Sequence, residues 1–307
     1  MTRPFLSIVM PVHGGGRWLD AALASMADDV PGALEVIVRD STPDGPCREA
    51  VDKHAARLAI DYQYVPEVAS WTRKTNMGVE AARAKHVCTL HQDDLWLDQR
   101  LAQARRMAAS WPDAAMCFSP SLFVDGADRR LGTWHPPFAP GVVDPERCRE
   151  MLLVQNSIAI PAPIVRRDAW LAVGGLDESL WYTPDWDMWL KLAGHGPVVY
   201  DREPTTAFRI HPESQTMTGK RDEFARQLEV VRQRHSRPGG RTERLALAST
   251  RINTALSDSA TGRPMAIFRA LAELAALGPV GAVRYLHASR LFERTLPRLR
   301  LRLSGAM

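Results

Sequence analysis

The feature that most constrains this chain is a pair of acids placed where a buried strand should leave a sheet. The apolar run 87–90 stops at His91-Gln92-Asp93-Asp94, and apolar residues resume at Leu95. Adjacent carboxylates repel each other and resist desolvation unless a cation or hydrogen-bond donors hold them in the charged form. A divalent metal would do so, because hard Mg²⁺ or Mn²⁺ prefers carboxylate oxygens. Acids that cap a helix starting near Leu97 explain the pair equally well when it is taken alone.

Short apolar runs alternate with helical patterns through the first half of the chain. Strands are expected at 6–12, 34–38, 60–65 and 87–90, and helices at 18–26, 47–57 and 72–84. This alternation predicts an α/β fold with a largely parallel central sheet flanked by helices. Ligands bind at the carboxyl ends of the strands in such sheets, so the loops after the first, second and fourth strands should meet in one crevice.

The chain changes character near Thr218. Beyond about Arg221 it reads as several amphipathic helices with Gly- and Pro-containing breaks, so we expect a first unit at 1–217 and a helical C-terminal region at 218–307. Residues 284–302 contain six arginines and the single acid Glu293, interleaved with leucines. This pattern favours contact with an anionic membrane surface or, equally, a helix packed on the first unit with a solvated basic face.

Composition excludes several classes of function. At 307 residues, with 45% hydrophobic residues and a net charge of +4, the chain is too weakly basic to indicate a nucleic-acid partner. The four cysteines show no zinc or CxxC spacing, so reduced, mostly structural thiols are expected. No signal peptide and no membrane-spanning run is evident, and the sequence therefore predicts a cytoplasmic protein.

Two strand ends could hold a nucleoside. Gly14, Gly15 and Gly16 follow the first strand and would allow the backbone to approach a phosphate or base, although a flexible turn explains them as well. Asp40 ends the second strand, where an acid could accept hydrogen bonds from a base or ribose. The alternative is an Asp that starts the turn at Pro43-Asp44-Gly45.

A second acidic site opens a helix at Thr183-Pro184-Asp185, with Thr as N-cap and Pro at the first helical position. Helical projection puts Asp185 on the flank of an arc of tryptophans, whereas Asp187 and Lys191 form an i, i+4 pair on the opposite, solvated face. A half-buried carboxylate at the positive end of a helix suits a general base. The alternative is that Asp185 is an ordinary acid in the first turn, where a negative charge stabilises the helix.

A later strand-like segment, 208–214, places Arg209 and His211 on one face. A cation beside an imidazole suits a diphosphate or a metal ion. A lone histidine would more often be an ordinary core or surface residue.

The motifs between Leu6 and Ser214, and their order along the chain, resemble those of the family-two glycosyltransferases. The matching segments are Ser7–His13, Glu35–Thr42, Asn76–Gly78 with Ala81–Arg83, His91–Asp94, Gly174–Glu178 with Pro184–Leu190, and Arg209-x-His211-x-x-Ser214. The chain departs from the family pattern at His91, which stands in place of the first Asp of the metal motif. It also departs at Pro184, which stands in place of a Glu beside the catalytic base.

The resemblance implies a GT-A fold and an inverting, nucleotide-sugar-dependent transferase that uses Mg²⁺ or Mn²⁺. It implies a saccharide or lipid-linked acceptor, in cell-surface polysaccharide or glycolipid synthesis, and it makes Asp185 the catalytic base. The implied donor-binding residues are Pro11, Val12, His13, Asp40, Asn76, Asp93, Asp94, Arg209 and His211, and the implied metal ligands are Asp93 and His211.

Two rival functions stay open at the level of sequence. A nucleotidyltransferase would use a similar sheet and metal, but it should carry a basic glycine-rich phosphate loop, and the first loop offers only His13, three glycines and Arg17. A catalytically silent sugar-nucleotide-binding protein is compatible with the departures at His91 and Pro184. The donor sugar and the acceptor depend on loops such as 132–140, which no spacing rule decodes.

Overall fold

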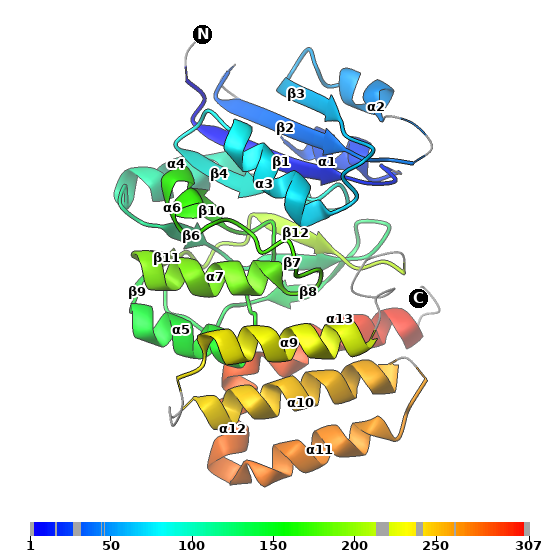
Figure 1. Ribbon diagram of the computed structural model, residues 1–307, viewed down its shortest axis with the longest axis vertical. Coiled ribbons are helices and arrows are strands. Elements are labelled where there is room, and N and C mark those ends of the chain that lie inside the picture. The colour runs from blue at the N-terminus through cyan, green and yellow to red at the C-terminus, as the bar shows by residue number, and fades with distance from the viewer. Residues whose placement is uncertain are drawn as a thin grey trace.

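The computed structural model describes residues 3–15, 17–26, 32–43, 45, 47–212, 221–237, 242–260 and 262–303. Gly16, Ser214 and the expected boundary near Thr218 lie outside these ranges. The fold is α/β, with a large central sheet, a smaller second sheet and a set of C-terminal helices (Figure 1).

The central sheet has eight strands in the order β3-β2-β1-β4-β10-β6-β11-β9. Its parallel half consists of β1 (Leu6–Val12), β2 (Leu34–Asp40), β3 (Ala59–Tyr64) and β4 (His86–Thr89). The other half is mixed and consists of β6 (Met116–Phe118), β9 (Gly141–Val143), β10 (Ile164–Arg166) and β11 (Val198–Tyr200). The four strands expected from the first half of the sequence are all confirmed.

Alternation along β1 decides which helix covers which face. Leu6, Ile8, Met10 and Val12 share one core cluster with Leu19 of helix α1 (Leu19–Ser25), on the face that also receives α4 (Arg100–Ser110). Val9 points to the other face, where it meets α3 (Trp71–Ala81). Contact there is so close that a Cβ on Gly78 would lie 2.4 Å from Val9 Cγ1. A short helix, α2 (Arg48–Asp52), completes this half.

The second sheet joins segments that are far apart in the sequence. Its order is β5-β12-β7-β8, formed by β5 (Leu95–Trp96), β12 (Thr206–Arg209), β7 (Ser121–Val124) and β8 (Arg130–Trp134). Strand β5 begins immediately after Asp94, and it pairs antiparallel with β12. This pairing carries Arg209 and the residues after it to the acidic motif.

The C-terminal helices continue the core of the first unit. Helices α5 (Pro145–Val154), α6 (Arg167–Ala172) and α7 (Pro184–His195) are followed by α9 (Arg221–His235), α10 (Glu243–Ala260), α11 (Ala266–Ala276), α12 (Gly278–Ser289) and α13 (Leu291–Leu303). Figure 1 shows α9 beneath α7, with α10 and α11 farther from the central sheet. Leu228 and Val231 of α9 share the large core cluster with Trp189 of α7, so the helical region is packed onto the first unit.

Helix α13 returns to the second sheet, where Leu301 packs with Phe123 and Ile210. The packing of this helix on the first unit is therefore confirmed, whereas its basic face is not fully solvated, because Arg294 and Arg298 are half-buried. Phe292, Leu296 and Leu299 are exposed. Among the described residues no single helix is long and apolar enough to cross a bilayer. Of the helix pairs in the described ranges, only α11 and α12 taken together have the required length and composition, with a bend of 114° between them.

Candidate active site

The loops after β1, β2 and β4 meet, as the strand order predicts. The backbone N–H of His13 donates to Gln92 Oε1 at 2.8 Å, and Gln92 Nε2 donates back to the His13 carbonyl at 2.9 Å. The Gly14 N–H donates to Thr42 Oγ1 at 3.1 Å. Gly14 has φ +70°, a conformation that favours glycine, so this loop is a specific turn as well as a candidate ligand contact.

The acidic motif forms a cluster held by the end of β12. Asp94 Oδ1 accepts a hydrogen bond from the Arg209 N–H at 3.1 Å, and Asp93 Oδ2 lies 2.9 Å from His211 Nε2. Ligand atoms of His91, Asp93 and Asp94 all lie within 4.8 Å of one another. The alternative of helix-capping acids is wrong, because α4 begins at Arg100 with Gln99 at its N-cap.

The pKa values of the two acids shift in opposite directions. Burial and the neighbouring Asp93 carboxylate raise the pKa of Asp94 well above its ordinary value. Burial acts in the same direction on Asp93, but the hydrogen bond from His211 and the electrostatic attraction of the two nearby imidazoles outweigh it, so the pKa of Asp93 is lowered. Without a cation, ionisation of Asp94 is therefore disfavoured beside an ionised Asp93.

The cluster has the character of a divalent-cation site. Asp94 Oδ2 and His91 Nε2 are buried and have no hydrogen-bond partner within the described ranges. Burial lowers the pKa of His91, which favours the neutral imidazole with a free lone pair. Two buried acceptors without donors, next to an ionised carboxylate, fit a hard or borderline metal ion. This set adds His91 and Asp94 to the predicted ligands Asp93 and His211. His211 Nε2 contacts Asp93, and His211 Nδ1 is buried without a hydrogen-bond partner within the described ranges.

Asp185 lies in the first turn of α7, as predicted, and its neighbours leave it little hydration. Asn156 Nδ2 donates to Asp185 Oδ2 at 2.8 Å. Burial raises the pKa of Asp185 to about 6, and the hydrogen bonds from Asn156 and from the helix backbone only partly oppose this shift. Thr183 occupies the N-cap position, but its side chain makes no capping hydrogen bond. A carboxylate with this pKa accepts protons efficiently near neutral pH.

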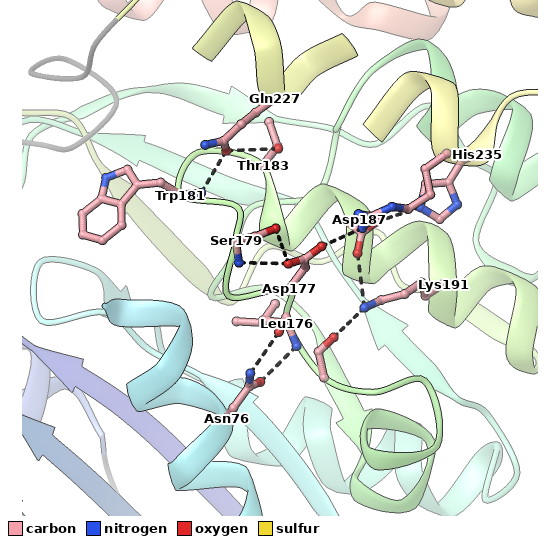
Figure 2. Close-up of polar contacts among 12 residues, drawn as sticks. Asn76, Leu176, Asp177, Ser179, Trp181, Thr183, Asp187, Lys191, Gln227 and His235 are labelled. Atoms are coloured by element: carbon pink, nitrogen blue, oxygen red, sulfur yellow. Dashed lines mark hydrogen bonds and ion pairs between the residues drawn. The ribbon is translucent and has the colours of Figure 1, made fainter. Parts of the chain in front are cut away.

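Two predicted donor contacts are corrected by the geometry. Asp40 is fully buried, and its two oxygens accept four hydrogen bonds, from Thr42 N and Oγ1, from Cys47 N and from Tyr62 OH. It therefore fixes the turn after β2 and has no free acceptor for a base. The Asn76 amide bonds Leu176 N and O and Glu178 Oε1, so it ties α3 to the segment before α7 (Figure 2).

Arg209 and Val12 are also placed behind the surface of the site. Arg209 is 1% exposed, and its guanidinium donates to the Asp93 carbonyl at 2.7 Å, to the Asp125 carbonyl at 3.0 Å and to the Asp128 carboxylate. This arrangement makes it a positioning residue for the acidic motif. Val12 is buried, and its carbonyl accepts a hydrogen bond from Lys74 Nζ.

Asp187 differs from its predicted solvated position. It is fully buried, and its carboxylate lies 3.2 Å from Lys191 Nζ, 2.9 Å from Arg234 Nη1 and 2.8 Å from His235 Nε2 (Figure 2). Burial opposes ionisation, but these three partners lower the pKa of Asp187 strongly. Helical projection finds the pair with Lys191 but cannot find α9, which covers this face of α7.

Helix α9 also holds the segment that leads into α7. Gln227 Oε1 accepts hydrogen bonds from the N–H groups of Trp181 and Tyr182 at 2.9 and 2.8 Å. Arg234 lies 2.9 Å from Asp177 Oδ2 as well as from Asp187. The first turn of α7, which contains Asp185, is thus held by a helix from the C-terminal region. Figure 2 shows Gln227 and His235 of this helix beside Thr183 and Asp187.

One cavity of about 1260 Å³ connects these groups. Pro11, His13, His91, Asp93, Asp94 and His211 line one part of it, and Asp185 with Asn156 lines another. The lining residues do not include four of the predicted donor contacts, Val12, Asp40, Asn76 and Arg209.

A family model described as glycosyl transferase family 2 matches residues 7–166, more than half of the chain. The chain belongs to glycosyl transferase family 2.

Relatives and solved structures agree with this family. An uncharacterized glycosyltransferase of Rickettsia typhi is 20% identical over 227 residues, which span 70% of this chain and 67% of the relative. S. aureus TarS 1–349, solved in complex with UDP-GlcNAc, superimposes with a TM-score of 0.63 at 14% identity, covering 88% of this chain and 89% of that one. The mannosyltransferase PcManGT from Pyrobaculum calidifontis, solved with GDP-Man and Mn²⁺, gives 0.59 at 17% identity, covering 100% and 86%. The fold is therefore of GT-A type.

The family match ends before α7 and β12, so the roles considered for Asp185 and His211 are supported by the geometry and not by the family match.

Lys74 is a site residue that the sequence pattern did not reveal. It is buried in the cavity wall, where its Nζ donates to the Val12 carbonyl at 2.5 Å and to Ser41 Oγ at 2.7 Å, and burial lowers its pKa to about 8. Its i, i+4 spacing to Gly78 on the face of α3 that packs against β1 is the signal that could have found it.

The Asp187 network predicts a measurable loss of stability in Asp187→Asn. We expect the free energy of unfolding at pH 7 to fall by about 2 kcal/mol, less than the roughly 3–5 kcal/mol of a fully buried pair because Lys191 and Arg234 keep some contact with water. The lowered pKa makes this contribution present above the unfolded Asp pKa, so the difference from wild type should shrink below about pH 4.

Urea unfolding at neutral pH and again in acid provides the measurement. Asp222→Asn, a change at an exposed acid of α9, is the matched control and should stay within about 0.5 kcal/mol of wild type. Equal stability of Asp187→Asn and the control would contradict the role assigned to the network.

Proposed function

We propose that this family-2 member is an inverting transferase that moves a sugar from a nucleoside-diphosphate sugar to an acceptor hydroxyl. The observation that carries the proposal is that a single cavity is lined both by the acidic cluster and by Asp185. The first group can hold a diphosphate through a cation, and the second can take a proton from an acceptor. A reaction between a phosphorylated donor and a hydroxyl needs these two functions in one space.

The donor end of the cavity is supported by its polar construction. The loops around His13 and Gln92 are locked to each other by paired backbone and side-chain hydrogen bonds, which leaves a rigid rim for a nucleoside. Trp18 packs against His211, with ring centroids 4.1 Å apart, and both residues line the cavity. The similar structures were solved with UDP-GlcNAc and GDP-Man, both nucleoside-diphosphate sugars.

The reaction follows from the chemistry of Asp185. Its carboxylate would accept the proton of the acceptor hydroxyl while that oxygen forms a bond to the anomeric carbon. The bond from the anomeric carbon to the diphosphate breaks with its electron pair on the leaving nucleoside diphosphate. A single displacement from the opposite face inverts the configuration, and no covalent sugar intermediate is needed.

A divalent cation, Mg²⁺ or Mn²⁺, fits the group of His91, Asp93 and Asp94. When bound, such an ion neutralises charge that develops on the leaving diphosphate. His211 would then keep Asp93 in its orientation through the 2.9 Å contact. PcManGT was solved with Mn²⁺, which is consistent with a divalent cation in this fold.

Asp185→Asn is the sharpest test of the catalytic assignment. The variant keeps the size of the side chain and its acceptor for Asn156 but removes the basicity, so turnover should fall by on the order of a hundredfold or more. The melting temperature should hold or rise, because a buried carboxylate with a raised pKa costs stability when it ionises. Initial rates with a panel of nucleotide sugars and thermal melts measure both effects.

The pH profile adds a second readout of the same assignment. Wild-type turnover should fall as the pH drops below about 6, where Asp185 takes up a proton, and this limb should vanish in Asp185→Asn. Near wild-type turnover in the variant would refute the assignment. Donor binding without transfer or hydrolysis in the wild type would instead favour a catalytically silent sugar-nucleotide-binding protein.

Metal dependence is predicted to reside in the acidic cluster. Chelator should abolish transfer, and Asp93→Ala should lower it by about a hundredfold or more, because the leaving diphosphate loses its countercharge. Initial rates and elemental analysis of each variant provide the measurement.

The matched control for the metal prediction is Asp98→Asn, because Asp98 is an exposed acid shortly after the cluster. This variant should keep both wild-type activity and wild-type metal content. Full activity in excess chelator, with no bound metal, would contradict a metal-dependent mechanism.

We also propose that the enzyme works in the cytoplasm, at the inner face of the membrane, in cell-surface polysaccharide or glycolipid synthesis. Support comes from α13, where Phe292 is 60% exposed and Leu296 is 45% exposed, beside the exposed Arg300. Exposed apolar side chains next to cations suit the interface of an anionic bilayer.

The membrane proposal predicts that the protein floats with vesicles that contain anionic lipid. The double variant Phe292→Ser, Leu296→Ser should float about tenfold less, because it loses apolar area that inserts between headgroups. Val142→Ser, at a 60% exposed apolar side chain on β9, is the control and should float like wild type. Equal flotation of the double variant and wild type would refute contact through α13.

A further inference from the structure

Three arginines of α13 form a ladder on the wall of the cavity that holds the candidate active site. Arg294, Arg298 and Arg302 are spaced by four residues, so they share one face of the helix, and all three line the cavity. The helix rises by 1.5 Å per residue, so the ladder is about 12 Å long. That is longer than one diphosphate group, and it leads away from the acidic cluster into the C-terminal helices.

The ladder has no countercharge within the described ranges. No acidic side chain there forms an ion pair with any of its three members, whereas Arg232, Arg251 and Arg269, on α9, α10 and α11, are each paired with an acid. Glu293 is the one acid of α13, and it bonds His135 and approaches Arg290 instead.

The contacts of the ladder are to neutral groups. Arg294 donates to the Ser289 carbonyl at 2.8 Å and to Asn253 Oδ1 at 3.4 Å. Arg298 donates to the Arg294 carbonyl at 2.6 Å and lies over the Phe123 ring at 5.6 Å. Burial lowers the pKa of both side chains to about 10, and for Arg298 the neighbouring arginines act in the same direction. Such cations gain most from an anionic ligand.

The α10 side of the cavity supplies a second, independent observation. Thr250 of α10 lines the cavity, is 8% exposed, and its Oγ1 has no hydrogen-bond partner within the described ranges. Apolar side chains from α10, α11 and α13 complete this part of the cavity, namely Leu256, Ile267, Leu291 and Leu299. Cations, a buried hydroxyl and an apolar lining together suit a phosphate group carried by a partly apolar molecule.

We propose that the ladder of Arg294, Arg298 and Arg302 is a subsite for phosphate on the acceptor. The acceptor is then an anionic, phosphate-bearing molecule, not a neutral saccharide. This inference rests on the proposed transferase function, because it assigns the part of the shared cavity that the donor does not need. The phosphate can belong to a lipid diphosphate or to a soluble phosphorylated glycan.

The test uses the full chain, with calorimetric titration of three probes in the presence of EDTA. The probes are geranyl diphosphate, inorganic pyrophosphate and geraniol. We expect geranyl diphosphate to bind, geraniol not to bind, and Arg298→Gln to weaken binding by about tenfold or more. Arg300→Gln, on the same helix but exposed and outside the cavity wall, should bind like wild type. Arg298→Lys should retain part of the affinity.

The two sources of phosphate give different results. Pyrophosphate binding as tightly as geranyl diphosphate indicates a soluble phosphorylated acceptor, and binding that needs the geranyl chain indicates a lipid-linked one. Arg298→Gln should keep or raise the melting temperature, because it removes a half-buried cation that has no acidic partner within the described ranges. This expectation separates loss of binding from loss of folding.

Three outcomes would overturn the proposal: wild-type affinity in Arg298→Gln, no binding of any phosphate probe, or an equal loss in Asp93→Asn. The last would place the phosphate at the acidic cluster. Nucleotide-sugar binding and hydrolysis are measured separately on the same samples. The transferase function fails if the wild type neither binds nor turns over any nucleotide sugar, whatever the phosphate probes do.

Discussion

The rest of the site depends on the desolvation of two adjacent carboxylates at the end of β4. Asp93 and Asp94 leave water only because β12 and the residues after it bring donors to them, the N–H of Arg209 and the ring of His211. The same contacts join the central sheet to the second sheet, since β12 pairs with β5 directly after the motif. The hydrogen bonds that these two carboxylates require therefore also hold the two sheets together and form one wall of the cavity.

The C-terminal helices form part of the candidate active site. Gln227, Arg234 and His235 of α9 hold the segment before α7 and its first turn, and α13 closes the cavity against the second sheet. Asp187 contacts two cations, Lys191 and Arg234, and the His235 ring, while Asp185 has only an amide partner from a side chain. Two acids two residues apart in one helix thus have opposite pKa shifts. Burial raises the pKa of Asp185, whereas the charged and hydrogen-bonding partners of Asp187 outweigh its burial and lower its pKa.

The cavity is divided by charge. One part carries the acids that suit a cation and a donor diphosphate, and another carries a row of arginines without acidic partners among the described residues. Asp185 lies in the same cavity, where a hydroxyl held by the second part could meet a sugar held by the first. Separate charges of this kind let one cavity hold two phosphorylated molecules without competition for the same groups.

The sequence by itself determined the parallel strands, the convergence of three loops and the candidate roles of Asp93 and Asp185, because apolar period, strand ends and helix starts are local properties. It could not show that Asp40 and Asn76 are saturated by their own neighbours, that Asp187 is buried, or that His91 and Asp94 lie beside Asp93 in the candidate cation site. Those facts depend on which distant segments donate hydrogen bonds to these side chains and bury them. Only the tertiary structure decided them, since burial and hydrogen-bond satisfaction arise between residues far apart in the sequence, such as Asp93 and His211, which are 118 positions apart.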